Sequence, residues 1–126
     1  MLFRSLLEQL RTRDIRVGVV TSKLAAGARD ELSRTGLAVH IEHLTGAEDV
    51  RQHKPAAEPL LRATSALRVA PAQTLMVGDT AADILGARAA GTLSGAALWG
   101  ARDRDELRAL NPDHLLEQPQ DILQLL

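Results

Sequence analysis

The sequence predicts an α/β fold, a doubly wound and mostly parallel sheet with helices on both faces. Two observations lead to this prediction. Segments with helical spacing of apolar residues alternate with short apolar runs along the whole chain, and the two strongest runs, at 15–22 and 74–79, end in small polar or acidic residues. No repeat, linker or low-complexity tract interrupts the 126 residues, so one domain is expected over 1–126.

The first half of the chain begins with a helix, because its leucines fall on one face. Next comes "IRVGVVTS", whose few polar interruptions predict a strand buried on both faces. Gly36 is expected to end the second helix. The predicted elements are a helix over 2–13, a strand over 15–22, a helix over 25–34, a weaker strand over 39–46 and, after a polar loop, a helix that can begin after Pro55 and runs to about Arg68.

The second half repeats the alternation. "TLMVGD" is the second strong strand, an alanine-rich helix stopped by Gly91 follows it, and "LSGAALWG" is a strand softened by glycine. The predicted elements are a strand over 74–79, a helix over 80–90, a strand over 93–100, a short helix over 103–110 and an edge strand over 113–118.

Composition excludes several classes of function. The net charge is −1, and there are one Trp, one Phe and no Tyr, so neither a basic stripe nor a base-stacking surface favours nucleic-acid binding. The absence of cysteine excludes disulfides and thiolate metal sites. No apolar run approaches the roughly 20 residues of a membrane helix. A soluble, cytoplasmic protein with no membrane or nucleic-acid partner is therefore expected.

Parallel sheets of this kind bind ligands at the carboxyl ends of their strands. Thr21 and Ser22 end the first strong strand, and Gly78 and Asp79 end the second. Lys54 lies in the loop before the third helix. We expect these side chains to converge on one edge of the sheet.

Two acids at and after the end of the second strong strand, Asp79 and Asp83, are suited to binding a metal ion. A carboxylate at Asp79 fits Mg²⁺, which takes few protein ligands and keeps its other positions for water and phosphate. Alternatively, Asp79 or Thr80 only caps the following helix. Asp83, one turn later, either supports the metal site or faces solvent.

The residues at the end of the first strong strand, together with Lys54, are suited to binding a phosphate group. Thr21 and Ser22 offer hydroxyl and backbone N–H donors, and Lys54 offers a positive charge. Each residue alone has a simpler interpretation, as a loop threonine bonded to its own backbone or as a surface lysine. The combination in chain order is more specific than any member.

The segments "VVTSK", "HKP" and "MVGDTAADILGARAAG" together resemble motifs two, three and four of the haloacid dehalogenase superfamily, and most of all its phosphoglycolate phosphatase and pyrophosphatase branch. The resemblance implies a Rossmann-like core and Mg²⁺-dependent hydrolysis of a small phosphorylated metabolite, such as a phosphoglycolate- or pyrophosphate-like substrate. It implies that Thr21 and Lys54 act in catalysis and, with Ser22, bind phosphate. It also implies that Asp79 ligates Mg²⁺ and that Asp83 supports that metal site.

One part of the family pattern does not occur in these residues. The family's nucleophile lies in an Asp-x-Asp motif on the central first strand, and a cap domain follows it; neither is found here. Asp103-Arg104-Asp105 is the one Asp-x-Asp in the chain, and its acids are expected to cap a helix or point to water. The chain alone is therefore predicted to be inactive or a fragment.

A missing central strand has a structural consequence. The strands at 15–21 and 74–78 would each expose unpaired backbone groups in the middle of the core, at a cost of about 1–3 kcal/mol per dry group. We therefore predict that these strands pair directly, or that another segment, such as one from a homodimer or a strand-completing partner, fills the slot.

Three functional hypotheses remain open at this point. The chain is part of a haloacid dehalogenase-type phosphatase, a non-catalytic Mg²⁺- and phosphate-binding regulatory protein or subunit, or an interaction module that retains relics of a site. Intact motif residues favour the first hypothesis.

Overall fold

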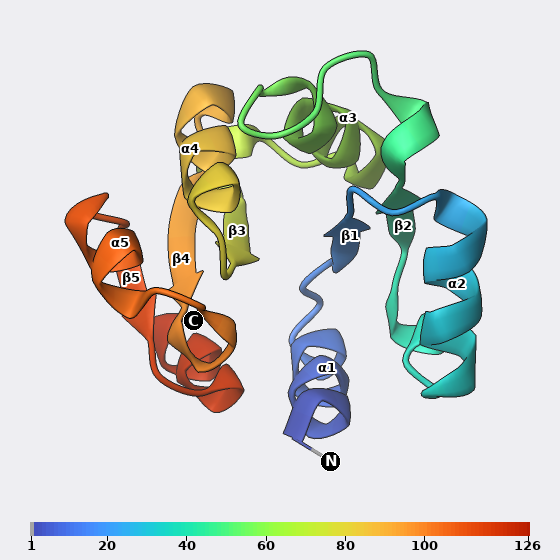
Figure 1. The fold of residues 1–126 in the computed structure, drawn as a ribbon. Helices are drawn as coiled ribbons and strands as arrows, with labels where there is room; N and C mark the ends of the chain where they lie inside the picture. Colours follow the sequence, from blue (N-terminus) through green and yellow to red (C-terminus); the bar gives the residue numbers. More distant parts are fainter. Residues whose placement is uncertain (1) are drawn as a thin grey trace.

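The computed structural model describes residues 2–126 (Figure 1). The helices are α1 (Leu2–Thr12), α2 (Ala25–Arg34), α3 (Glu58–Leu67), α4 (Ala81–Ala90) and α5 (Arg104–Ala109). The strands are β1 (Gly18–Val20), β2 (His43–Thr45), β3 (Leu75–Gly78), β4 (Leu93–Ala97) and β5 (His114–Leu116). Short 3₁₀ helices lie at Ala38–His40, Ala47–Asp49, Pro71–Gln73, Leu98–Gly100 and Pro119–Leu125.

The strands pair in parallel throughout, as the alternating pattern predicts. β1 pairs with β2, and β3, β4 and β5 pair in that order. Helices cover both faces, so the doubly wound α/β class is confirmed. Figure 1 shows the two sheets as separate groups, with α3 and α4 packed beside each other where the groups meet. Among the described residues, no helix is long and apolar enough to cross a membrane.

The prediction that β1 and β3 pair directly is wrong, because they belong to different sheets. The prediction that the first strand is buried on both faces is also wrong. Gly18 is exposed and Val19 and Val20 are only half-buried, because one edge of β1 pairs with β2 and the other borders a cleft. The other alternative, a further segment in the slot, stays a prediction.

All five described strands are shorter than the runs that predict them. The run over 39–46 begins with the 3₁₀ turn Ala38–His40, and the run over 93–100 ends in the 3₁₀ turn Leu98–Gly100. The strands end where their pairing ends: the β1–β2 ladder has three residue pairs, and the β4–β5 ladder stops at Ala97. Helix ends match better, and Gly91 closes α4 with φ +78°, a conformation that glycine adopts without strain.

Two apolar clusters hold these elements together. The first lies within the three-stranded part and contains Ile84, Ala96, Leu98 and Leu107, none more than 2% exposed. The second joins the two sheets: Leu60 of α3 packs with Ala87 and Ala90 of α4, against Val20 of β1 and Met76 of β3. The α3–α4 contact therefore sets how the two strand edges face each other.

Candidate active site

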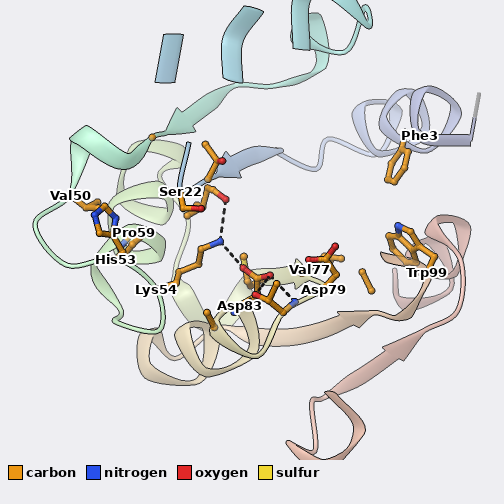
Figure 2. A pocket seen from close by; sticks show the side chains of 18 residues that line it. Phe3, Ser22, Val50, His53, Lys54, Pro59, Val77, Asp79, Asp83 and Trp99 are labelled. Carbon is orange, nitrogen blue, oxygen red and sulfur yellow. Dashed lines mark hydrogen bonds and ion pairs between the residues drawn. The ribbon is translucent and has the colours of Figure 1, made fainter. Parts of the chain in front are cut away.

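A cleft of about 510 Å³ lies between the carboxyl ends of β1 and β3 (Figure 2). Its lining includes all five residues that the sequence singles out: Thr21, Ser22, Lys54, Asp79 and Asp83. The predicted convergence is thus confirmed as geometry, although the side chains meet at a cleft between two sheets and not at one edge of a single sheet. The roles of these residues in phosphate binding, metal binding and catalysis stay predictions.

Lys54 is the residue that crosses the cleft. Its Nζ lies 2.6 Å from Asp83 Oδ1 and donates to the backbone carbonyl of Val20 at 3.4 Å. Both charged side chains are largely buried, with 15% of Lys54 and 9% of Asp83 exposed. An ammonium group has three N–H donors, so one remains for a ligand oxygen. In this position the Lys54 ammonium can neutralise charge on a ligand while it stays bonded to β1 through Val20 and to α4 through Asp83.

Asp83 is held at the start of α4 by local hydrogen bonds. Thr80 is the N-cap, and its Oγ1 accepts from the Asp83 N–H at 3.3 Å. In return, Asp83 Oδ2 accepts from the Thr80 N–H at 3.1 Å and from the Thr80 hydroxyl at 2.9 Å, which completes a capping box. The expected cap is therefore real, but Thr80 provides it and Asp79 does not.

Gly78 makes room for this arrangement. A Cβ atom at Gly78 would lie 2.3 Å from three side-chain atoms of Asp83, closer than real contacts allow. Only a residue without a side chain lets the end of β3 pass so close to the first turn of α4.

Asp79 differs from Asp83 in its environment. Its side chain is exposed, lines the cleft and makes no hydrogen bond or ion pair with the described residues. Its Oδ2 atom would lie 2.6 Å from a Cβ at Gly100, so glycine at 100 keeps the space beside this carboxylate open. Asp79 is thus the carboxylate with lone pairs available to a cation.

The hydroxyl pair lies at the end of β1, opposite Asp79. The Thr21 N–H continues the sheet by donating to the Thr45 carbonyl at 3.0 Å, and Thr21 Oγ1 accepts from the Lys23 N–H at 3.1 Å. The hydroxyl proton of Thr21 remains available as a donor. Ser22 is exposed at the cleft. Both interpretations of Thr21, local backbone bonding and ligand binding, are compatible with this geometry.

A carboxylate outside the cleft orders the loop that carries Lys54. Glu58 accepts from the backbone N–H groups of Arg51 at 2.8 Å and Gln52 at 3.2 Å. The hydrogen bond from Arg51 is the main reason that the pKa of Glu58 lies below its usual value. Glu58 therefore fixes the approach of the loop to the cleft without entering it.

The cleft residues without an assigned role in the sequence analysis include Phe3, His53 and Trp99. The Phe3 and Trp99 rings contact each other edge to face, with centroids 6.2 Å apart. Phe3 lies on the leucine stripe of α1, three, four and seven residues before Leu6, Leu7 and Leu10, so its spacing did not distinguish it from a core residue. His53 precedes Lys54 directly and begins the segment "HKP", but the sequence analysis gave it no role.

The expectation for the one Asp-x-Asp of the chain is confirmed. Asp103 is the N-cap of α5 and accepts from the Glu106 N–H at 3.0 Å. The Asp105 side chain is 96% exposed and lies 3.5 Å from Arg108. Neither acid lines the cleft.

The donor set in the cleft fits Mg²⁺ better than a metal that needs a protein cage. No group of three or more His, Cys, Asp or Glu residues in the described part of the chain could hold a metal ion. Mg²⁺ usually takes one or two carboxylates and keeps several waters, and Asp79 supplies one unpaired carboxylate.

Comparison with known proteins decides the family. The model of the haloacid dehalogenase-like hydrolases matches residues 3–97, about three quarters of the chain. The chain belongs to this family. Strands β1 to β4 and the residues from Thr21 to Asp83 lie within the matched region, so the resemblance drawn from the three sequence segments is confirmed.

Individual relatives agree with the family. The chain is 32% identical over 117 residues to pyrophosphatase PpaX of Oceanobacillus iheyensis, covering 93% of this chain and 55% of the relative. A Lactobacillus plantarum structure assigned as a phosphoglycolate phosphatase has a TM-score of 0.88 and 31% identity, covering 98% of this chain and 58% of that one. The structure of a subfamily IA hydrolase of Geobacter sulfurreducens has a TM-score of 0.82 and 29% identity, covering 98% of this chain and 58% of that one. The chain thus spans a little over half the length of the proteins it matches.

Proposed function

We propose that this chain carries the phosphate- and metal-binding part of a phosphatase that acts on a small phosphate ester or pyrophosphate. The observation that carries the proposal is the convergence of Thr21, Lys54 and Asp79 on one cleft in a chain of this family. Relatives assigned as a pyrophosphatase and a phosphoglycolate phosphatase support the substrate class.

Each residue has a defined part in this proposal. Lys54, anchored by Asp83 and the Val20 carbonyl, directs its remaining N–H to a phosphoryl oxygen and neutralises its charge. Thr21 and Ser22 donate hydrogen bonds to other oxygens of the group. Asp79 would hold Mg²⁺, and Asp83 would support this metal site. When bound, Mg²⁺ supplies Lewis-acid stabilisation of negative charge. Asp83 contributes mainly by orienting Lys54 and the start of α4.

The number of carboxylates among the described cleft residues favours a second candidate function, binding of Mg²⁺ and phosphate without catalysis. The carboxylates that line the cleft are Asp79 and Asp83, and Asp83 already bonds Lys54 and Thr80. These residues provide binding groups and no additional carboxylate to attack phosphorus. The chain by itself would then bind Mg²⁺ and phosphate without turnover, as a regulatory or interacting subunit.

Metal titration tests the binding proposal. Calorimetric titration of the chain with Mg²⁺ should show binding that Asp79→Asn weakens at least tenfold, because a neutral amide replaces the one unpaired carboxylate. Asp105→Asn is the matched control, since Asp105 is an acid 96% exposed and away from the cleft. Equal Mg²⁺ affinity in all three proteins would overturn the metal site.

Phosphate binding and turnover separate the two candidates. Inorganic phosphate should bind more weakly to Thr21→Val than to the original chain, with Thr12→Val on α1 as a matched control. Hydrolysis of pyrophosphate or phosphoglycolate by residues 1–126 alone, lost in Asp79→Asn, would reject the non-catalytic candidate. Binding without hydrolysis would support it.

A further inference from the structure

Helix α2, which follows the end of β1, begins without a cap from its own sequence. The first N–H groups of a helix need acceptors outside it, and the N-cap residue Leu24 has no side-chain oxygen to offer. Glu48 supplies the acceptor from the loop after β2. Its Oε1 and Oε2 atoms accept from the Ala25 N–H at 3.0 and 3.4 Å. An acid from a different part of the chain therefore caps this helix.

Gly46 lets the loop that carries Glu48 come this close to α2. A Cβ atom at position 46 would lie 2.6 Å from the Ala25 nitrogen, 2.8 Å from the Ala25 Cβ and 2.7 Å from Glu48 Oε1. The φ of Gly46 is −101°, which suits any residue, so the close contact is what requires glycine here. The Gly46 N–H also donates to Asp49 Oδ2 at 2.7 Å, and this bond holds the loop in shape.

Two further hydrogen bonds join the same two segments of the chain. The Thr21 N–H donates to the Thr45 carbonyl at 3.0 Å. The Ala47 N–H donates to the Lys23 carbonyl at 2.9 Å. Within the turn 21–24, the Lys23 N–H donates to Thr21 Oγ1 at 3.1 Å, so the conformation of the turn decides where the Thr21 hydroxyl proton can point. Glu48 holds the far end of this turn, where it enters α2.

Glu48 acts on the cleft from outside it. Its side chain is exposed and is not part of the cleft lining, whereas Thr21 and Ser22 of the turn line the cleft. A carboxylate bonded to this turn has two opposing effects on a bound phosphate. Its negative charge repels the phosphate, and its hydrogen bond keeps the donors of the turn in place. Because the two effects have opposite signs, removal of the carboxylate shows which one is larger.

We propose that Glu48 is a positioning residue for phosphate: by capping α2 it fixes the turn 21–24, so that Thr21 and Ser22 direct their donors to the same phosphate group. The inference rests on the proposed phosphate site and adds to it a residue from outside the cleft. Positioning outweighs repulsion, because the Glu48 carboxylate is exposed and solvent ions screen its charge. Its hydrogen bond, in contrast, is directed at one backbone group, the Ala25 N–H.

Two substitutions of Glu48 separate positioning from charge. Glu48→Gln removes the charge and keeps an oxygen that can accept from the Ala25 N–H, whereas Glu48→Ala removes both. Glu42→Ala is the matched control, because Glu42 accepts from the Val17 N–H at 3.3 Å, just before the other end of β1. In calorimetric titration with inorganic phosphate, Glu48→Ala should bind at least about threefold more weakly than the original chain. Glu48→Gln and Glu42→Ala should bind no more weakly.

Tighter phosphate binding by both Glu48 variants would show that the charge dominates and would overturn the proposal. An equal loss in both would overturn it as well, because the retained oxygen would then have no effect. Phosphate affinity unchanged in Glu48→Ala would reject this inference alone, whereas no phosphate binding by the original chain would reject the proposed phosphate site with it.

Amide hydrogen exchange resolved by NMR tests the positioning without phosphate. In Glu48→Ala the amides of Lys23 and Ala47, which bond across the turn, should exchange at least about threefold faster than in the original chain. In Glu42→Ala they should exchange at the original rate. Unchanged exchange of both amides in Glu48→Ala would overturn the proposal, even where phosphate binds.

Discussion

The middle strand of the three-stranded sheet, β4, and the strand beside the cleft in the two-stranded sheet, β1, differ in how completely they are buried. In the three-stranded part, Ser94, Gly95, Ala96 and Ala97 of β4 are all buried, and β4 has a neighbour on each side. In the two-stranded part no residue of β1 is buried, although its sequence is richer in valine. The two strands that border the cleft, β1 and β3, contain no buried residue, whereas Leu44 and Thr45 of β2 are buried. What covers a strand therefore decides its burial, and the local sequence only makes it suitable for that position.

The contrast extends to packing. The cluster around Ile84 lies entirely within the three-stranded part, whereas β1 reaches an apolar cluster only through Val20, at the α3–α4 junction. We infer that the three-stranded part is the more stable of the two and that the two-stranded part depends on its connections to it.

The largest expected effect compares the two cores directly. Ile84→Ala, at a side chain with no exposed area, should lower the free energy of unfolding by about 4 kcal/mol, because it removes buried carbon and leaves a cavity. Val19→Ala, half-buried in β1, should cost about 1 kcal/mol or less. Urea unfolding of both variants measures the difference, and equal losses would contradict the contrast between the sheets.

The next effect tests the connection across the cleft. Asp83→Ala should cost about 3 kcal/mol, because it leaves the buried Lys54 ammonium without its counterion. Asp105→Ala, which removes an exposed partner of Arg108, should change stability by about 0.5 kcal/mol or less. Adding Lys54→Met to Asp83→Ala should restore part of the loss. A small loss in Asp83→Ala would mean that the pair is effectively solvated.

A smaller effect contrasts two glycines. Gly78→Ala places a Cβ 2.3 Å from Asp83 and should cost about 2 kcal/mol through overpacking. Gly27→Ala, inside α2 with nothing within 4 Å of the added Cβ, should stabilise the chain by about 0.5–1 kcal/mol. Thermal unfolding of the two variants should therefore shift in opposite directions. A shift in the same direction would contradict the assigned role of Gly78.

The smallest effect is a pH dependence in the three-stranded part. Asp113 accepts from the Ser94 N–H at 2.8 Å, and this bond lowers the pKa of its carboxyl below the ordinary 3.8. The stabilisation is fully present above that ordinary value and is lost as the pH falls through the lowered one. Asp113→Asn should flatten the acid limb of stability measured by urea unfolding from about pH 7 to about pH 3. An unchanged acid limb would contradict this.

Much of the fold was predictable because helix and strand patterns are local. The five helices fall where apolar spacing and glycine ends predict them, and the parallel arrangement follows from alternation. The length and burial of β1 were not predictable, because they depend on whether a neighbour lies along its second edge. The run at 39–46 likewise becomes a strand only over His43–Thr45, where β1 lies beside it.

Some residues of the candidate site could likewise be predicted from the sequence, and others could not. Thr21, Lys54 and Asp79 could be chosen from the sequence because the ends of parallel strands meet at one edge. Phe3 and Trp99 were not chosen, because their contact joins residues far apart in the sequence and no local pattern encodes it. The partnership of Asp83 with Lys54 was also out of reach, since it depends on the packing of α3 against α4.

The aromatic contact at the cleft gives the molecule a built-in optical reporter. The chain has one tryptophan and no tyrosine, so intrinsic fluorescence comes from a single indole, and that indole touches the sole phenylalanine of the chain. Any event that moves α1 relative to the end of β4 changes the surroundings of this indole. The emission spectrum should therefore follow the opening and filling of the cleft without any added label.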